Sequence, residues 1–320
     1  MGVVEEILEG SVKSAARLIS QVEEGRDEAY TALSRLISYT GKAHILGITG
    51  PAGSGKSTLA GHLAVSFSDL GGKVGVIATD PSSIKGGGAF LGDRLRMKDA
   101  EKRNIFIRSM AHRGHPGGIA RAAAGAMYVL EALGKDIIIL ESAGAGQGEK
   151  GLFYMCDTII TLFTPEYGDE FQLMKAGLLE IGDIIVVNKT DKPGTEEAER
   201  ELKALSSGRE WPNSWTVPVL LVQADRSEGV EALVQAVKSH WQFLAESGKR
   251  EELHREKAEV FLMTLLKEEL WKRFSGKLRE SAFCSGILDE AFAGKTDPYS
   301  AILRILDSME IREGNTLGER

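Results

Sequence analysis

ILGITGPAGSGKST, residues 45–58, joins a short apolar run to a glycine-rich loop and then to the beginning of a helical pattern. The loop fits G-x-x-x-x-G-K-[ST], the P-loop pattern, and it stands between a strand and a helix as that pattern requires. Its glycines let backbone N–H groups turn inward toward phosphates, and the helix N-terminus adds a favourable dipole. We expect nucleotide phosphates to be held by Gly50, Ala52, Gly53, Ser54, Gly55, Lys56, Ser57 and Thr58.

The end of this loop carries the charge and the hydroxyl that phosphate chemistry needs. We expect Lys56 to reach the β- and γ-phosphates and the Ser57 hydroxyl to bind Mg²⁺. Asp80 and Glu141 each stand at the end of an apolar run. A carboxylate at the carboxyl end of a strand beside a P-loop is expected near the metal. The interpretation of Glu141 stays open, because it could bind the metal directly, bind it through water, or orient the attacking water.

Two further candidates lie in glycine-rich segments. Asp93 follows the loop that contains residues 86–88, and it is expected either to join the metal carboxylates or to cap a helix. The N–H of Gly144 is expected to contact the γ-phosphate, so that hydrolysis would let its loop relax.

Asn188-Lys189-Thr190-Asp191 follows another apolar run and predicts which base the site binds. The Asp191 carboxylate can accept both N1–H and the exocyclic N2–H of guanine, whereas adenine would leave it unpaired. Lys189 can lie over the base plane, and Asn188 can tie the loop back to the P-loop. A second base-contacting loop is expected at Gln223 and Ala224. The predicted nucleotide is therefore GTP or GDP.

Short Val/Ile-rich runs alternate with helical stretches between residues 44 and 244, a pattern typical of a doubly wound, mostly parallel α/β sheet. We expect an N-terminal helical arm over 1–43, with two helices broken near residues 25–27. The pattern over residues 245–320 predicts helices with an apolar stripe. This stripe is too one-sided to form a core of its own. That stripe predicts packing on the main domain or on another subunit.

The composition excludes several classes of function. A formal net charge of −7 disfavours nucleic acid as a main partner, because phosphates need a basic face. The two cysteines are far apart, so they predict neither a disulfide framework nor a Cys-x-x-Cys metal clip. No run reaches the ~18 apolar residues of a membrane span. We expect a cytoplasmic protein without a membrane partner.

Several motifs go beyond a general P-loop domain. They are Ala16-Arg17-Leu18-Ile19, Asp80-Pro81-Ser82-Ser83, Leu91-Gly92-Asp93-Arg94, Gly117-Gly118-Ile119-Ala120, Glu141-x-x-Gly144-x-Gly146-Gln147-x-Glu149, Gly168-Asp169-Glu170 and Asp297-Pro298-Tyr299. Together they resemble the MeaB/ArgK-type (MMAA-like) GTPases, the accessory proteins of adenosylcobalamin-dependent acyl-CoA mutases. The resemblance covers most of the chain.

The resemblance implies a GTP-hydrolysing chaperone that gates adenosylcobalamin loading and protects such a mutase. Among these mutases it favours methylmalonyl-CoA mutase. It implies a homodimer held by the C-terminal helices. It matches Asp80, Asp93 and Glu141 with carboxylates around Mg²⁺ and catalysis. It matches residues 168–177 with a mobile switch in which Lys175 approaches the nucleotide.

Two other classes compete with this reading. A nickel-delivery GTPase of the urease or hydrogenase maturation type would share the P-loop domain but needs a Cys/His metal cluster, and the sequence has none. A kinase for a small molecule would need an aspartate base at the phosphoryl acceptor, and the guanine motif argues against ATP as its donor.

Overall fold

The computed structural model describes residues 2–80, 103, 105–111, 118–142, 154–165, 177–207 and 215–308. The chain divides into two compact units, Met1–Leu262 and Met263–Arg320, which are described separately below. The first unit carries every sequence-predicted nucleotide-site residue.

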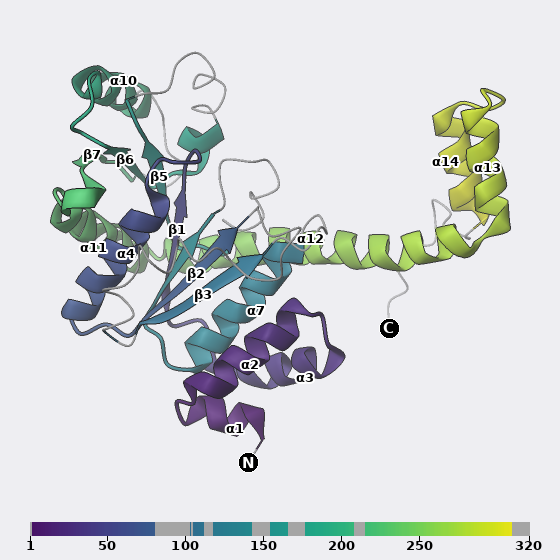
Figure 1. The fold of residues 1–320 in the computed structure, drawn as a ribbon, viewed down its shortest axis with the longest axis horizontal. Coiled ribbons are helices and arrows are strands. Elements are labelled where there is room, and N and C mark those ends of the chain that lie inside the picture. Colours follow the sequence, from purple (N-terminus) through teal and green to yellow (C-terminus); the bar gives the residue numbers. More distant parts are fainter. Residues whose placement is uncertain are drawn as a thin grey trace. The chain divides into compact units, whose positions relative to one another are not determined.

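A parallel β-sheet forms the centre of the first unit (Figure 1). Its seven strands lie in the order β3-β2-β4-β1-β5-β6-β7, and every neighbouring pair is parallel. The bounds are β1 His44–Thr49, β2 Val74–Asp80, β3 Phe106–Ala111, β4 Ile137–Glu141, β5 Thr158–Phe163, β6 Ile184–Asn188 and β7 Val219–Val222. All residues of β1, β5 and β6 are buried, as their continuous apolar runs predict. The predicted fold class is confirmed.

Helices cover both faces of this sheet, because successive strand residues point to opposite faces. Leu46 and Ile48 of β1 belong to a core with α4 (Lys56–Asp69) and α11 (Val230–Glu246). Ile45 belongs to the other core, with α7 (Gly118–Ala132) and the N-terminal helices. A smaller core joins β5 and β6 to α10 (Thr195–Ser207). The 3₁₀ turns are η1 (Ile37–Tyr39) and η3 (Ala224–Arg226).

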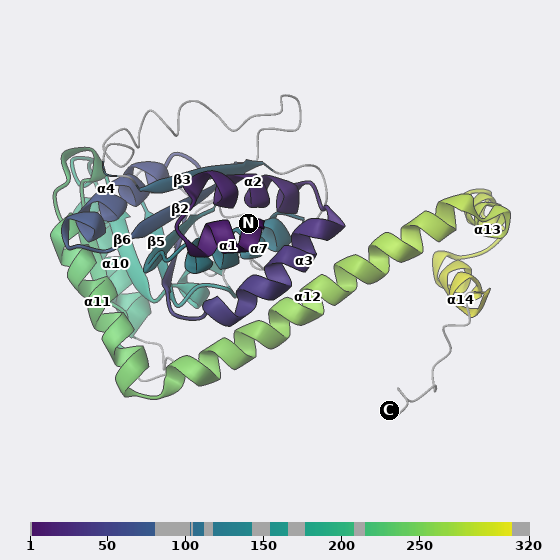
Figure 2. The same ribbon diagram turned by 90° about the horizontal axis from the view of Figure 1, so that it is seen from below.

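The N-terminal arm has three helices, where the sequence predicted two. They are α1 (Val3–Leu8), α2 (Val12–Glu23) and α3 (Asp27–Leu36), and they gather around α7 in both views (Figures 1 and 2). The predicted break near 25–27 is present. A second break was missed at Gly10, which adopts φ +92°, and Ser11 then caps α2 by accepting the N–H of Ser14.

The C-terminal segment is helical, as predicted. Helix α12 (Lys249–Glu280) begins in the first unit and continues into the second, where α13 (Ala282–Phe292) and α14 (Pro298–Ser308) follow. Contrary to the expectation from the one-sided stripe, α13 and α14 share a small core. It consists of Cys284, Ile287, Ala301 and Ile305.

Candidate functional site

Glycines shape the P-loop where β1 ends. Gly50, Gly53 and Gly55 all have positive φ, which disfavours other residues. A Cβ on Gly50 would lie 2.6 Å from the carbonyl oxygen of Leu162, and one on Gly55 would lie 2.3 Å from Nδ2 of Asn188. The loop therefore packs too closely against β5 and the end of β6 to accept a side chain at these two positions.

Lys56 starts α4 and is buried although it carries a charge. Its Nζ donates to the carbonyl oxygens of Gly50 at 3.0 Å and Pro51 at 2.9 Å. The ammonium group thus lies across the loop whose N–H groups are expected to hold the phosphates. Burial strengthens its electrostatic effect on any anion bound there.

Ser57 and Glu141 meet beside the P-loop, and both are buried. The Ser57 hydroxyl donates to Oε1 of Glu141 at 2.5 Å. Strand register places Glu141 opposite Ile48, so the end of β4 lies next to the end of β1. The Thr79 hydroxyl donates to the Glu141 carbonyl at 3.0 Å, which joins β2 to the same point. A hydroxyl and a carboxylate form the hard oxygen donor set that Mg²⁺ prefers.

The other predicted metal carboxylates are placed less fully. Asp80 is the last residue of β2, two positions beyond Ala78, which pairs with Glu141. Its backbone therefore ends at the same edge as Glu141 and the P-loop. Asp93, Gly144 and Lys175 lie outside the described residues.

Asn188 connects the predicted base loops to the P-loop. Its Nδ2 donates to the Ser54 carbonyl at 2.7 Å, as the sequence analysis expected. Its Oδ1 accepts the backbone N–H of Ala224 at 3.0 Å, a contact the sequence analysis did not anticipate. One buried amide side chain thus holds the phosphate loop and both base-contacting segments together.

The structure also describes the other residues that are predicted to contact the base. Lys189 has φ 61°, which turns the chain sharply after β6. Asp191 is exposed, so its carboxylate is open to a base. Gln223 is buried, and its backbone N–H donates to the Glu228 carbonyl at 3.0 Å. Asn188, Ala224 and the P-loop therefore meet at the carboxyl edge of the sheet.

Sequence reasoning missed the polar contacts at the opposite, amino edge of the sheet. Asp136, Asp157 and Asp183 each directly precede a strand. Their Oδ2 atoms each accept a backbone N–H at the beginning of a neighbouring strand. The donors are Lys73, directly before β2, at 3.0 Å, Ile45 of β1 at 2.8 Å and Ile159 of β5 at 2.8 Å. The repeated pattern of an aspartate before an apolar run could have revealed this role.

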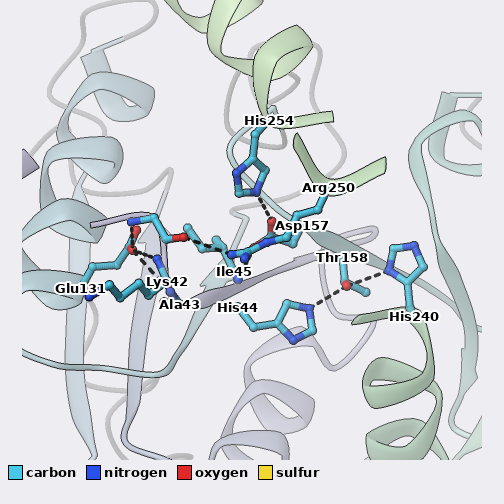
Figure 3. Close-up of polar contacts among 11 residues, drawn as sticks. Lys42, Ala43, His44, Ile45, Glu131, Asp157, Thr158, His240, Arg250 and His254 are labelled. Atoms are coloured by element: carbon cyan, nitrogen blue, oxygen red, sulfur yellow. Dashed lines mark hydrogen bonds and ion pairs between the residues drawn. The ribbon is translucent and has the colours of Figure 1, made fainter. Parts of the chain in front are cut away.

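A chain of buried side chains also crosses this amino edge (Figure 3). Oγ1 of Thr158 lies 2.8 Å from Nε2 of His44 and 2.8 Å from Nδ1 of His240. His44 stacks on Trp241 with a ring-centroid distance of 4.0 Å. Burial lowers the pKa of His44 to about 3, so this imidazole is neutral at physiological pH.

Among the described residues, no helix has the length and apolar character needed to traverse a lipid bilayer. Within that same part of the chain, no group of three or more His, Cys, Asp and Glu side chains is arranged to hold a metal ion.

Comparison with known proteins identifies the family. The model of the methylmalonyl-CoA mutase-associated GTPase MeaB matches residues 15–279. A Pyrococcus abyssi relative is 38% identical over 308 residues, 95% of each chain, and Escherichia coli GTPase ArgK is 32% identical over 277 residues, 83% of each chain. The fused isobutyryl-CoA mutase of Geobacillus kaustophilus is 34% identical over 212 residues, 62% of this chain and 19% of that protein.

A solved structure agrees on the fold. The crystal structure of a LAO/AO transport system kinase superposes with a TM-score of 0.70 at 23% identity, covering 96% of each chain. The resemblance inferred from the motifs is confirmed by the family model and the relatives. With a P-loop, a guanine motif and these relatives, the chain belongs to the MeaB family of GTPases.

Proposed function

We propose that this GTPase gates the loading of adenosylcobalamin into an acyl-CoA mutase and protects that enzyme, with methylmalonyl-CoA mutase as the most specific candidate. The description of the family supports the mutase partner. Further support comes from the fused isobutyryl-CoA mutase, in which a segment similar to this chain makes up only 19% of a longer protein. A GTPase segment in one chain with a mutase indicates that the two act together.

The observation that carries the hydrolytic part is the buried Ser57–Glu141 contact beside Lys56. Ser57, Glu141 and Asp80 would hold Mg²⁺, which when bound neutralises charge on the phosphates. Lys56 would leave the carbonyls of Gly50 and Pro51 and donate to phosphate oxygens instead. Asp93 is a further candidate carboxylate around Mg²⁺ and catalysis. Glu141 is also a candidate for orienting the attacking water, and the Gly144 N–H for contacting the γ-phosphate. Asp191 would accept the guanine N–H groups, with Lys189 over the base and Gln223 and Ala224 beside it.

The partner is proposed to control hydrolysis through residues 168–177. Lys175 would approach charge that grows in the transition state, and such a contact lowers the barrier selectively. Hydrolysis should be slow alone and faster with the cognate mutase. The test is a GTPase assay of the wild type and Lys175→Ala, each with and without methylmalonyl-CoA mutase. The variant should keep basal turnover and lose the stimulation; equal stimulation of both proteins would contradict the switch assignment.

Cofactor gating needs a separate experiment. Apo-mutase is mixed with adenosylcobalamin and this protein in the presence of GDP, GTP or a non-hydrolysable GTP analogue, and cofactor uptake is followed by absorbance. We expect the rate of uptake to depend on the nucleotide. Identical rates in all three mixtures would contradict gating, and the GTPase assignment would stand. No observation favours the nickel-delivery alternative, which nickel titration of the purified protein would test.

We also infer a homodimer through the C-terminal helices. Support comes from large apolar side chains that are exposed on them: Leu262, Leu266, Leu270, Trp271, Phe292, Tyr299 and Leu303. Leu262, Leu266 and Leu270 recur every four residues on α12, which is the spacing of one helix face. An exposed apolar helix face is typical of an interaction surface. Light scattering should report a dimer for the full chain, a monomer for Leu270→Glu and a dimer for the exposed control Lys267→Gln. A full chain that is monomeric at micromolar concentration would overturn the inference.

A further inference from the structure

Asp157 differs from the two other aspartates that precede strands. All three accept a backbone N–H at the beginning of a neighbouring strand, but Asp136 is exposed and the Asp183 side chain keeps 27% of its surface accessible. The Asp157 side chain is only 2% accessible. Its second oxygen, Oδ1, lies 2.5 Å from Nε2 of His254 in the first turns of α12 (Figure 3). One buried carboxylate thus contacts both β1 and α12.

Hydrogen bonds stabilise the charged form of the Asp157 carboxylate. Burial by itself would raise the pKa of Asp157, but the hydrogen bonds from His254 and from the Ile45 N–H outweigh it, and the pKa lies below its usual value. The side chain is therefore ionised at neutral pH. Hydrogen bonds to a charged group are about twice as strong as neutral ones.

Arg250 adds a second connection between α12 and the beginning of β1. Its guanidinium lies over the Trp241 ring at 4.3 Å, and Trp241 in turn stacks on His44, the first residue of β1. The same guanidinium donates to the Gly41 carbonyl at 3.2 Å. The start of α12 is thus held against the amino end of β1 by a stacked and hydrogen-bonded corner, as Figure 3 shows in part.

Strand β1 joins this corner to the nucleotide site. The strand has six residues, all buried, and the P-loop begins directly after it. Parallel neighbours pair with it on both sides, so it is a rigid element. We propose that Asp157 couples the first turns of α12 to the P-loop through β1. Nucleotide binding and the docking of α12 against the amino end of β1 would then influence each other.

This coupling has a defined consequence. If nucleotide binding strengthens the docking of α12 against β1, then this docking must strengthen nucleotide binding by the same factor. Helix α12 continues into the second unit. A partner that binds the second unit would therefore influence the nucleotide site through the Asp157–His254 contact. The inference rests on the GTPase site, and it adds a positioning role for Asp157 and His254 that the sequence motifs did not indicate.

Hydrogen–deuterium exchange of the full chain, with and without a non-hydrolysable GTP analogue, tests the coupling through Asp157. In the wild type, the analogue should slow exchange in residues 50–58, which reports binding, and also in residues 253–260 of α12. His254→Ala should speed exchange in 253–260 by about tenfold, the effect of losing one hydrogen bond to a charged group. It should also abolish the response of 253–260 to the analogue.

Two further variants separate coupling from general damage. His254→Gln keeps an N–H donor near the position of Nε2, so it should restore the response of residues 253–260. Asp136→Asn weakens the equivalent contact at β2 without touching α12, so it should leave the response unchanged. The proposal is overturned if the wild type binds the analogue but residues 253–260 do not respond, or if His254→Ala responds like the wild type. Absence of protection at 50–58 would instead contradict the nucleotide site itself.

Discussion

The two edges of the central sheet are built on different principles. At the carboxyl edge, glycines, Lys56 and Ser57 lie close together in the sequence and make a loop whose N–H groups are expected to hold phosphates. At the amino edge, side chains far apart in the sequence satisfy one another, as His254 and Asp157 do across 97 residues. The carboxyl edge is proposed to bind a ligand, whereas the side chains described at the amino edge contact one another. Substitutions at the carboxyl edge should therefore affect chemistry, whereas substitutions at the amino edge should affect stability and the proposed coupling to α12.

The largest expected effect is at the carboxyl edge. Lys56→Ala should lower GTP turnover by on the order of 10³-fold, because a preorganised donor near the developing charge is lost. The fold should persist, since the buried ammonium donates to two carbonyl oxygens of the P-loop itself. Turnover is measured by phosphate release, and the fold by circular dichroism. Unchanged turnover would remove Lys56 from the proposed mechanism.

The amino edge should respond to acid instead. His44 titrates near pH 6.5 when unfolded and near 3 when folded, so the unfolded chain binds more protons between these values. Its contribution to the free energy of unfolding is then lost as pH falls from 6.5 toward 3, on the order of 5 kcal/mol in total. The lowered pKa of Asp157 adds a loss only below 3.8.

Urea unfolding at pH 7, 6 and 5 measures this dependence. His44→Gln keeps a donor for Thr158 but does not titrate, so its stability should vary less with pH than that of the wild type. His62→Gln serves as the control, because His62 lies on α4 outside the buried chain. Parallel pH profiles for wild type and His44→Gln would show that this imidazole is not the responsible group.

Base recognition should give the next effect. Asp191→Asn replaces an acceptor by a group that also donates, so GTP affinity should fall by about 10²-fold, the cost of weakened bonds to a charged group. Affinity for xanthosine triphosphate should rise, because xanthine presents an oxygen where guanine presents its exocyclic amine. Calorimetry on both proteins measures the switch. Wild type that binds ATP as tightly as GTP would contradict the guanine assignment.

The smallest effect is expected from a strand clamp at the amino edge. Asp136→Asn weakens one exposed hydrogen bond to the Lys73 N–H, so the free energy of unfolding should fall by about 0.5–1.5 kcal/mol. GTP turnover should stay at the wild-type value. A loss of turnover comparable to that of Lys56→Ala would break the distinction between the two edges.

The sequence was most informative where function is encoded locally. The P-loop and the guanine motif each occupy a few consecutive residues at a strand end, so fold class and the position of Glu141 beside Ser57 could be predicted. The seven parallel strands follow from continuous apolar runs between helical patterns. The roles of Asp93, Gly144 and Lys175 stay predictions, because these residues lie outside the described chain.

Other features could not be predicted because they depend on distant pairing. Thr158 meets His44 and His240 across 114 and 82 residues, and no local pattern encodes those contacts. The additional break at Gly10 was overlooked although Gly10-Ser11 is a typical helix end followed by a cap. Helical periodicity continued through that break and concealed it.

The close approach of Gly55 to Asn188 has an evolutionary consequence. Asn188 belongs to the guanine motif, yet its amide also supports the Ser54 carbonyl and fills the space beside Gly55. Changes at these two positions should therefore be epistatic, since neither side chain can be replaced without altering the other's surroundings. A descendant of this protein could alter its base preference readily at Asp191, but its phosphate loop and Asn188 would have to be inherited together.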